Sequence, residues 1–132
     1  MLDGGRAMKQ DVSVDILKDK VLTEIGVCRD QDEIYFKVSD KEIYLMHHYQ
    51  SCCESVVIED ICGNFEDLIG SPILIAEERC NYDSPEGQVE SRDMSETWTF
   101  YEFATLKGSV TIRWYGTSNG YYSESVNFER IF

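Results

Sequence analysis

Hydrophobic and polar residues alternate with a period of two over much of the chain, which is the pattern of β-strands with one buried face. In residues 32–40, Ile34, Phe36 and Val38 fall on the same side of an extended chain. The polar letters SDK come next and predict a hairpin turn. Residues 42–48 then alternate again. Together these residues predict a two-stranded antiparallel ribbon.

The strongest alternation lies in residues 97–128. Thr99, Tyr101 and Phe103 alternate with Trp98, Phe100 and Glu102, and after the turn letters LKGS the residues Val110, Ile112 and Trp114 alternate with Thr111, Arg113 and Tyr115. Aromatic and β-branched residues in this order are typical of paired strands. The pattern predicts a second hairpin, with Trp114 in the core, followed by a turn at the letters SNG and a final strand.

The remaining segments give shorter signals. Residues 55–61 and 72–78 are rich in Val and Ile and predict strands. Between them, Asn64 is a favourable N-cap and Gly70 a favourable end, so a short helix is expected there. Residues 14–25 fit either a helical turn or a strand entering at Val21, and residues 80–96 predict a long exposed loop.

The predicted fold class is mainly β, with α+β character. We expect an antiparallel twisted sheet or a partly open barrel with one or two short helices. The chain has 132 residues, which suits one domain with a single core. Residues 1–13 are expected to be a flexible N-terminal segment, and residues 14–132 a single globular β-rich domain.

The charge balance restricts the choice of partners. With 12 basic and 25 acidic residues the net charge is −13, which disfavours direct binding to nucleic acid and to anionic membranes. The acidity either serves solubility alone or forms a surface that docks on a basic protein. The absence of a long apolar run and of a secretion signal predicts a cytoplasmic protein. The sequence leaves open whether it is a monomer or a small homo-oligomer.

The segment MHHYQSCCES holds both histidines of the chain and two adjacent cysteines. Adjacent cysteines rarely bridge each other, so reduced thiols or metal ligands are expected. His48, Cys52 and Cys53 supply three of the four ligands that a tetrahedral structural zinc needs, provided that the chain turns between them. The fourth ligand is left open among His47, Cys62 and the carboxylates of Glu54, Asp60, Glu77 and Glu78.

Other readings of the same segment compete with zinc. Cys52 and Cys53 could be small buried residues, with His48 a hydrogen-bonded side chain at a strand end. A nucleophilic pair of Cys53 and His48 lacks a third, orienting group and an oxyanion hole in the sequence. No glycine-rich phosphate loop is present, and the alternating aromatic residues fit cross-strand pairs better than a platform for bases.

Two blocks carry a resemblance to a known family: HYQSCCESVVIEDICGNFEDLIGSPILIAEE at residues 48–78 and TWTFYEFATLKGSVTIRWYGTSNGYYSESV at residues 97–126. They resemble a small family of unknown function carried by bacteriophages and prophages, over roughly residues 17–130. The likeness is most specific in His-x-x-x-Cys-Cys-Glu and Thr-Ile-Arg-Trp-Tyr-Gly, and weakest in residues 80–94. The chain is also similar to metal-containing type II-A anti-CRISPR proteins, which strengthens the expectation of zinc.

Two functional hypotheses follow. The resemblance implies a phage-type accessory protein that binds and inhibits a basic host defence protein, namely an RNA-guided type II CRISPR nuclease, with zinc in a structural role. The alternative is a small zinc-dependent hydrolase acting on a nucleotide signal, with Glu54 or Glu78 as general base. Four protein ligands would indicate the structural role, and three ligands plus water the enzyme.

Overall fold

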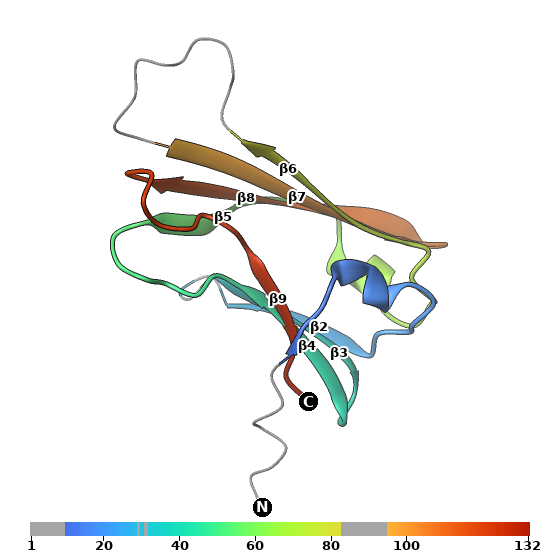
Figure 1. Cartoon of the computed structure of the whole chain (residues 1–132). Coiled ribbons are helices and arrows are strands. Elements are labelled where there is room, and N and C mark those ends of the chain that lie inside the picture. Colours follow the sequence, from blue (N-terminus) through green and yellow to red (C-terminus); the bar gives the residue numbers. More distant parts are fainter. Residues whose placement is uncertain (1–9, 29, 31, 83–94) are drawn as a thin grey trace, which may run out of the picture.

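The computed structural model describes residues 10–28, 30, 32–82 and 95–132, which fold into two antiparallel sheets (Figure 1). The five-stranded sheet has the order β1 (Gln10–Asp11), β9 (Asn127–Arg130), β4 (Glu42–His47), β3 (Glu33–Ser39) and β2 (Glu24–Cys28). The four-stranded sheet has the order β5 (Ser55–Cys62), β8 (Gly108–Ser118), β7 (Ser95–Thr105) and β6 (Ile75–Tyr82). The mainly β fold class is confirmed, as two layers that do not close into a barrel.

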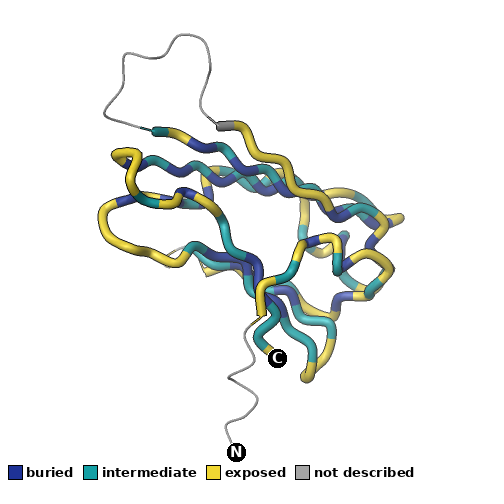
Figure 2. Tube along the Cα trace, in the orientation of Figure 1, coloured by how far each residue is buried: buried dark blue, intermediate teal, exposed yellow. Residues whose placement is uncertain are grey.

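Both predicted hairpins are present, because the alternation in each strand matches one buried and one solvent-facing side. In β3, Ile34 and Phe36 have no exposed surface, and in β8 Val110, Ile112 and Trp114 face inward. The buried hydrophobic side chains of the two sheets form a single core between the layers (Figure 2). Trp114 and Trp98 lie on opposite faces of the β7–β8 hairpin, since Thr99 is the residue that pairs with Trp114.

Two single turns of 3₁₀ helix accompany the sheets. The turn η3 (Phe65–Leu68) begins at the predicted N-cap, where the side chain of Asn64 accepts a hydrogen bond from the Glu66 N–H at 2.9 Å. The turn η2 (Val14–Leu17) buries Val14 and Leu17 against the core. Residues 14–25 therefore contain both alternatives, a helical turn first and then isolated bridges from Val21 and Leu22 before β2 begins.

Some predicted boundaries differ from the structure. Cys80, expected at the start of a loop, lies in β6, which pairs with β7 through Tyr82. The sequence does not indicate a strand at residues 77–81, because this part of β6 is exposed, mostly polar and without a hydrophobic period. Gln10 and Asp11 pair with β9, although they fall in the segment expected to be flexible. Residues 83–94, most of the predicted loop, lie outside the described residues.

The chain crosses from one sheet to the other twice at the same end of the molecule, on the left in Figure 1. Residues 48–54 lead from β4 to β5, and residues 119–126 lead from β8 back to β9. These two connections bring the predicted metal segment beside a part of the chain nearly eighty residues later, since His48 and Ser125 are 77 positions apart. None of the described helical turns has the length or the apolar run needed to span a bilayer.

Candidate functional site

His48 joins the two connections between the sheets. Its Nδ1 lies 2.7 Å from the carbonyl oxygen of Ser125, and its Nε2 lies 2.7 Å from a carboxylate oxygen of Glu54. A backbone carbonyl can only accept a hydrogen bond, and so can an ionised carboxylate. Donation from both ring nitrogens satisfies both contacts, in a place where the His48 side chain is only 4% exposed.

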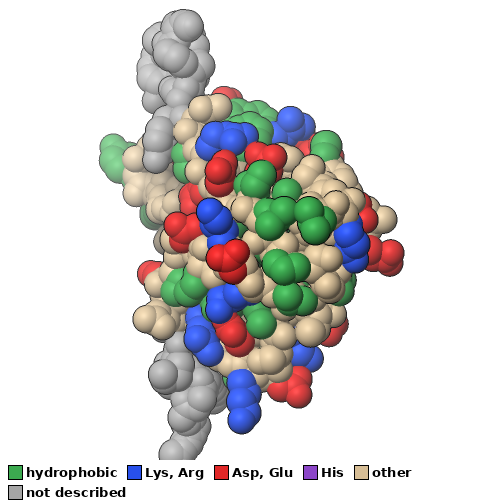
Figure 3. Space-filling view, turned by 90° about the vertical axis from the view of Figure 1, so that its right-hand side faces the viewer, with side chains coloured by type: hydrophobic (Ala, Val, Ile, Leu, Met, Phe, Trp, Pro, Cys, Tyr) green, Lys and Arg blue, Asp and Glu red, His purple; other side chains and the backbone are tan. Residues whose placement is uncertain are grey.

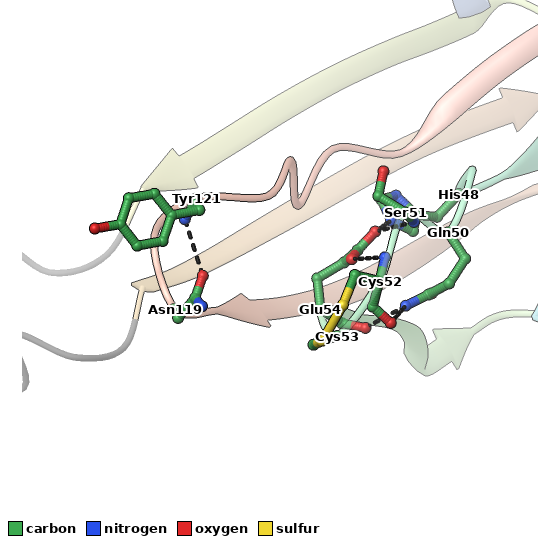
Figure 4. The surroundings of a disulfide bond; sticks show 8 residues. All are labelled: His48, Gln50, Ser51, Cys52, Cys53, Glu54, Asn119 and Tyr121. Atoms are coloured by element: carbon green, nitrogen blue, oxygen red, sulfur yellow. Dashed lines mark hydrogen bonds and ion pairs between the residues drawn. A yellow bond between two sulfur atoms is a disulfide. The ribbon is translucent and has the colours of Figure 1, made fainter.

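The Glu54 carboxylate is the centre around which the loop of residues 48–54 is folded (Figure 4). One oxygen accepts the Ser51 N–H at 2.7 Å and the His48 Nε2–H, and the other accepts the Cys52 N–H at 2.9 Å. These bonds, first that of the Ser51 N–H and also those of Cys52 and His48, outweigh desolvation and lower the pKa of Glu54 to about 2. Glu54 is thus an ionised carboxylate whose side chain has no exposed surface.

Cys52 and Cys53 are joined by a disulfide at the exposed outer side of this loop. The expectation that these neighbours would not bridge is therefore wrong. The local reason is the turn itself: Glu54 holds the N–H groups of Ser51 and Cys52, so the backbone doubles back where the two sulfurs meet. The sulfur atoms of a disulfide are not thiolates, and thiolate is the form of cysteine that binds metals.

The arrangement does not fit a tetrahedral zinc site. Among the described residues, no group of three or more His, Cys, Asp and Glu side chains is placed to hold a metal ion. His48 and the Cys52 N–H both contact Glu54, and both nitrogens of His48 are occupied by hydrogen bonds. Zinc binding requires reduction of the disulfide and release of His48 from Glu54; it stays a prediction, which elemental analysis of the reduced protein tests.

The candidates for a fourth ligand lie in other environments. His47 contacts Glu129 of β9, with 3.2 Å between its Nε2 and the carboxylate. Cys62 and Asp60 stand together at the end of β5, where the thiol donates to the carboxylate at 3.4 Å. Glu77 and Glu78 lie on β6, at the far edge of the four-stranded sheet.

A second buried carboxylate, Glu129, supports the same end of the molecule, and it was not among the residues predicted for the site. Glu129 accepts hydrogen bonds from the Tyr49 hydroxyl at 2.8 and 2.6 Å, besides its contact with His47. The bond to Glu129, with burial and its charge, raises the pKa of Tyr49 to about 12. Glu129 follows Phe128 in the last strand, and no sequence motif marks it as a partner of residues 80 positions earlier.

Comparison with protein families shows which family this chain belongs to. The model of a domain of unknown function, DUF7448, matches residues 8–128. The chain belongs to this family. The match extends over nearly the whole chain, as the resemblance to a family of unknown function implied. No curated protein and no solved structure matches the chain.

The geometry of this DUF7448 domain indicates what the loop can do. His48 and Glu54 are saturated with hydrogen bonds and buried, so they hold the two connections together rather than contact a substrate. The disulfide between Cys52 and Cys53 lies in the exposed part of the loop, residues 49–53. The buried pair of His48 and Glu54 thus has a structural role, and an exposed disulfide that can be reduced lies beside it.

This placement leads to a prediction about thiol reactivity. In protein purified without reductant, iodoacetamide is expected to modify Cys28, Cys62 and Cys80, which are free and exposed, and to leave Cys52 and Cys53 unmodified. After reduction all five should react. Peptide mass mapping of both samples measures this, and the unreduced peptide containing residues 52 and 53 should be lighter by two hydrogens. Free thiols at these two positions in the unreduced sample would contradict the disulfide.

Proposed function

We propose that this domain is a binding protein that docks through β6 on a basic partner protein. The observation that carries the proposal is a pair of adjacent carboxylates, Glu77 and Glu78, on β6, which is an edge strand among the strands that the structure describes. Both residues are exposed, and no ion pair joins either of them to a basic side chain in the described part of the chain. Uncompensated charge at an accessible edge favours a partner of opposite charge.

The opposite edge of the same sheet is different. On β5, the Glu59 carboxylate accepts a hydrogen bond from Arg113 Nε at 2.6 Å, and Asp60 lies 3.9 Å from the same guanidinium. The Arg113 charge therefore offsets one of these two negative charges within the molecule. Figure 3 shows a face on which basic and acidic side chains are interspersed around a group of hydrophobic ones, so net charge alone does not identify that face as a docking surface.

The partner to test first is an RNA-guided type II CRISPR nuclease. The resemblance to phage-borne proteins and to type II-A anti-CRISPR proteins supports this choice, and so does the chemistry, because such a nuclease holds its heteroduplex in a positively charged channel. An acidic protein docked in that channel competes with nucleic acid. The chain would then act by occupying a surface and not by catalysis.

Charge reversal tests the docking surface. The double variant Glu77→Lys/Glu78→Lys is expected to weaken binding to the guide-loaded nuclease by roughly tenfold or more, because two attractive charges become repulsive. The control Asp30→Lys/Glu66→Lys makes the same change in net charge at two exposed positions away from β6. Binding kinetics at two salt concentrations and a DNA cleavage assay measure the effect, with association slowing as salt shortens the Debye length below about 10 Å.

Each result has a clear meaning. A large loss for the β6 variant and a small one for the control supports docking through β6. Equal losses would show that only overall charge matters. If no nuclease in a panel of type II effectors binds the unmodified protein, the nuclease is not the partner.

The alternative of a zinc-dependent hydrolase has no support from the described residues. Glu54, one candidate general base, already accepts three hydrogen bonds and has no exposed side-chain surface. A general base must reach the proton that it removes. Glu78, the other candidate, stands on β6 away from His48 and the cysteines.

A further inference from the structure

A groove of about 690 Å³ runs between η2 and the first part of β6. Its walls include apolar side chains, among them Val14, Leu74 and Ala76. Carboxylates of Asp15, Glu77 and Glu78 also line it, and Lys18 is the basic residue in the lining. The groove therefore combines an apolar wall with a net negative charge, which suits a ligand that has a hydrocarbon part and a positive end.

A buried hydroxyl lies close to a residue that lines this groove. Tyr101 of β7 has no exposed surface, and among the described residues its hydroxyl oxygen is the buried side-chain polar atom without a hydrogen bond. Such an atom is costly unless a ligand or water satisfies it. Tyr101 pairs with Glu78 across the β6–β7 ladder, and partners directly opposite in a ladder project from the same face of the sheet.

The hydroxyl also lies close to two groups that line the groove. Burial is the main reason that the pKa of Tyr101 is raised, and the charges of Glu78 and Cys80 and an interaction of the hydroxyl with the Glu78 side chain contribute to the rise. Both Glu78 and Cys80 belong to the groove lining. The Cys80 thiol donates to Glu78 at 3.8 Å, which leaves most of the acceptor capacity of that carboxylate unused. The Tyr101 hydroxyl thus lies beside Glu78, which lines the acidic groove.

We propose that the groove between η2 and β6 binds one arginine side chain of the basic partner. The methylene stem would pack on the apolar wall, and the guanidinium would donate to the Glu78 carboxylate and to the Tyr101 hydroxyl oxygen. Arginine suits this site better than lysine, because its planar group offers five N–H donors in fixed directions and is more weakly hydrated. The inference rests on the proposed function for the source of the arginine, whereas its test needs no nuclease.

Cys80 offers a direct measure of occupancy. It is exposed and free and lines the groove, whereas Cys28 and Cys62, also exposed and free, do not. The probe is a short neutral peptide with one central arginine, and its control is the same peptide with citrulline, which has nearly the same shape without the charge. Unreduced full-length protein is treated with iodoacetamide, a neutral reagent, and the modification rate at each cysteine is followed by peptide mass mapping.

The arginine peptide is expected to slow modification of Cys80 in a saturable way and to leave the rates at Cys28 and Cys62 unchanged. The citrulline peptide should protect roughly tenfold less well, since it loses the charge-assisted hydrogen bonds. Equal protection by both peptides, equal slowing at all three cysteines, or no effect on Cys80 would each overturn the proposal.

Two variants assign the contacts. Glu78→Gln and Tyr101→Phe should each raise the peptide concentration needed for half-protection of Cys80 by roughly tenfold. Glu59→Gln, at the opposite edge of the sheet, should not change it. Each comparison uses the ratio of rates with and without peptide, so a change in the basal reactivity of Cys80 cancels. Unchanged half-protection in both groove variants would contradict the assigned contacts.

The two proposals can fail separately. If the peptide protects Cys80 but no nuclease binds the chain, the groove is an arginine site of a protein with another partner. If a nuclease binds through β6 but the peptide gives no protection, the docking surface stands and the arginine site is wrong.

Discussion

Replacing Trp114 by Ala is expected to destabilise the domain by about 3–5 kcal/mol, a large share of the stability of a typical domain. Trp114 is 1% exposed and belongs to the four-stranded sheet. Its indole N–H points across the core to the sulfur of Met46 in the five-stranded sheet, at 3.3 Å. Truncation would leave a cavity between the layers and remove this contact, so both sheets lose packing together.

Trp98→Ala is the matched control. Trp98 is half-buried on the outer face of the same hairpin, with its ring 4.4 Å from that of Tyr115 and the Arg113 guanidinium 5.5 Å from its centre. Loss of these contacts is expected to cost about 1 kcal/mol. Denaturant unfolding of the wild type and both variants measures the difference. A stable Trp114→Ala domain that fails only to bind a partner would show that Trp114 belongs to an interface.

The strands and the core could be predicted because their information is local. The period of two around Phe36 and around Ile112 decides which side chains face inward, whatever lies opposite. The capping residue Asn64 likewise acts within its own turn. The division of the strands into two sheets could not be predicted from the alternation. It depends on the connections, residues 48–54 and 119–126, which have no hydrophobic period.

The loop of residues 48–54 could be singled out from the sequence, but its hydrogen bonds could not. The density of His and Cys in residues 47–53 identified the loop, because polar and reactive side chains are not placed there by strand patterning. What decides the chemistry is that Glu54 points inward and gathers the N–H groups of the loop, and that Ser125 arrives from the other connection. A sequence lists donors and acceptors but does not show which of them meet.

Glu54 gives the second large expected effect. Glu54→Gln should lower the melting temperature much more than Glu66→Gln. The second variant makes the same exchange of a carboxylate for an amide at an exposed position of η3. An amide has one oxygen that accepts and one nitrogen that donates. Since both oxygens of Glu54 accept N–H groups in the wild type, the amide nitrogen must face the N–H of Cys52 or those of Ser51 and His48.

Acid should have the same effect on the wild type as this substitution. The folded protein lowers the pKa of Glu54 from 4.5 to about 2, so the folded state favours the ionised form. The resulting stability is fully present above pH 4.5 and is lost progressively as the pH falls toward 2, where the carboxyl becomes protonated in the folded state as well. A protonated carboxyl, like the amide, places a donor against the N–H groups of the loop.

The melting temperatures of the wild type and of Glu54→Gln are expected to converge as the pH falls. At pH 7 the wild type should melt well above Glu54→Gln, and the gap should narrow steadily between pH 4.5 and pH 2, while Glu66→Gln follows the wild type throughout. Thermal unfolding monitored by circular dichroism across this range gives all three curves. A gap that stays constant down to pH 2 would show that the ionisation of Glu54 does not stabilise the loop. The lower stability of the variant would then have another cause than the lost charge.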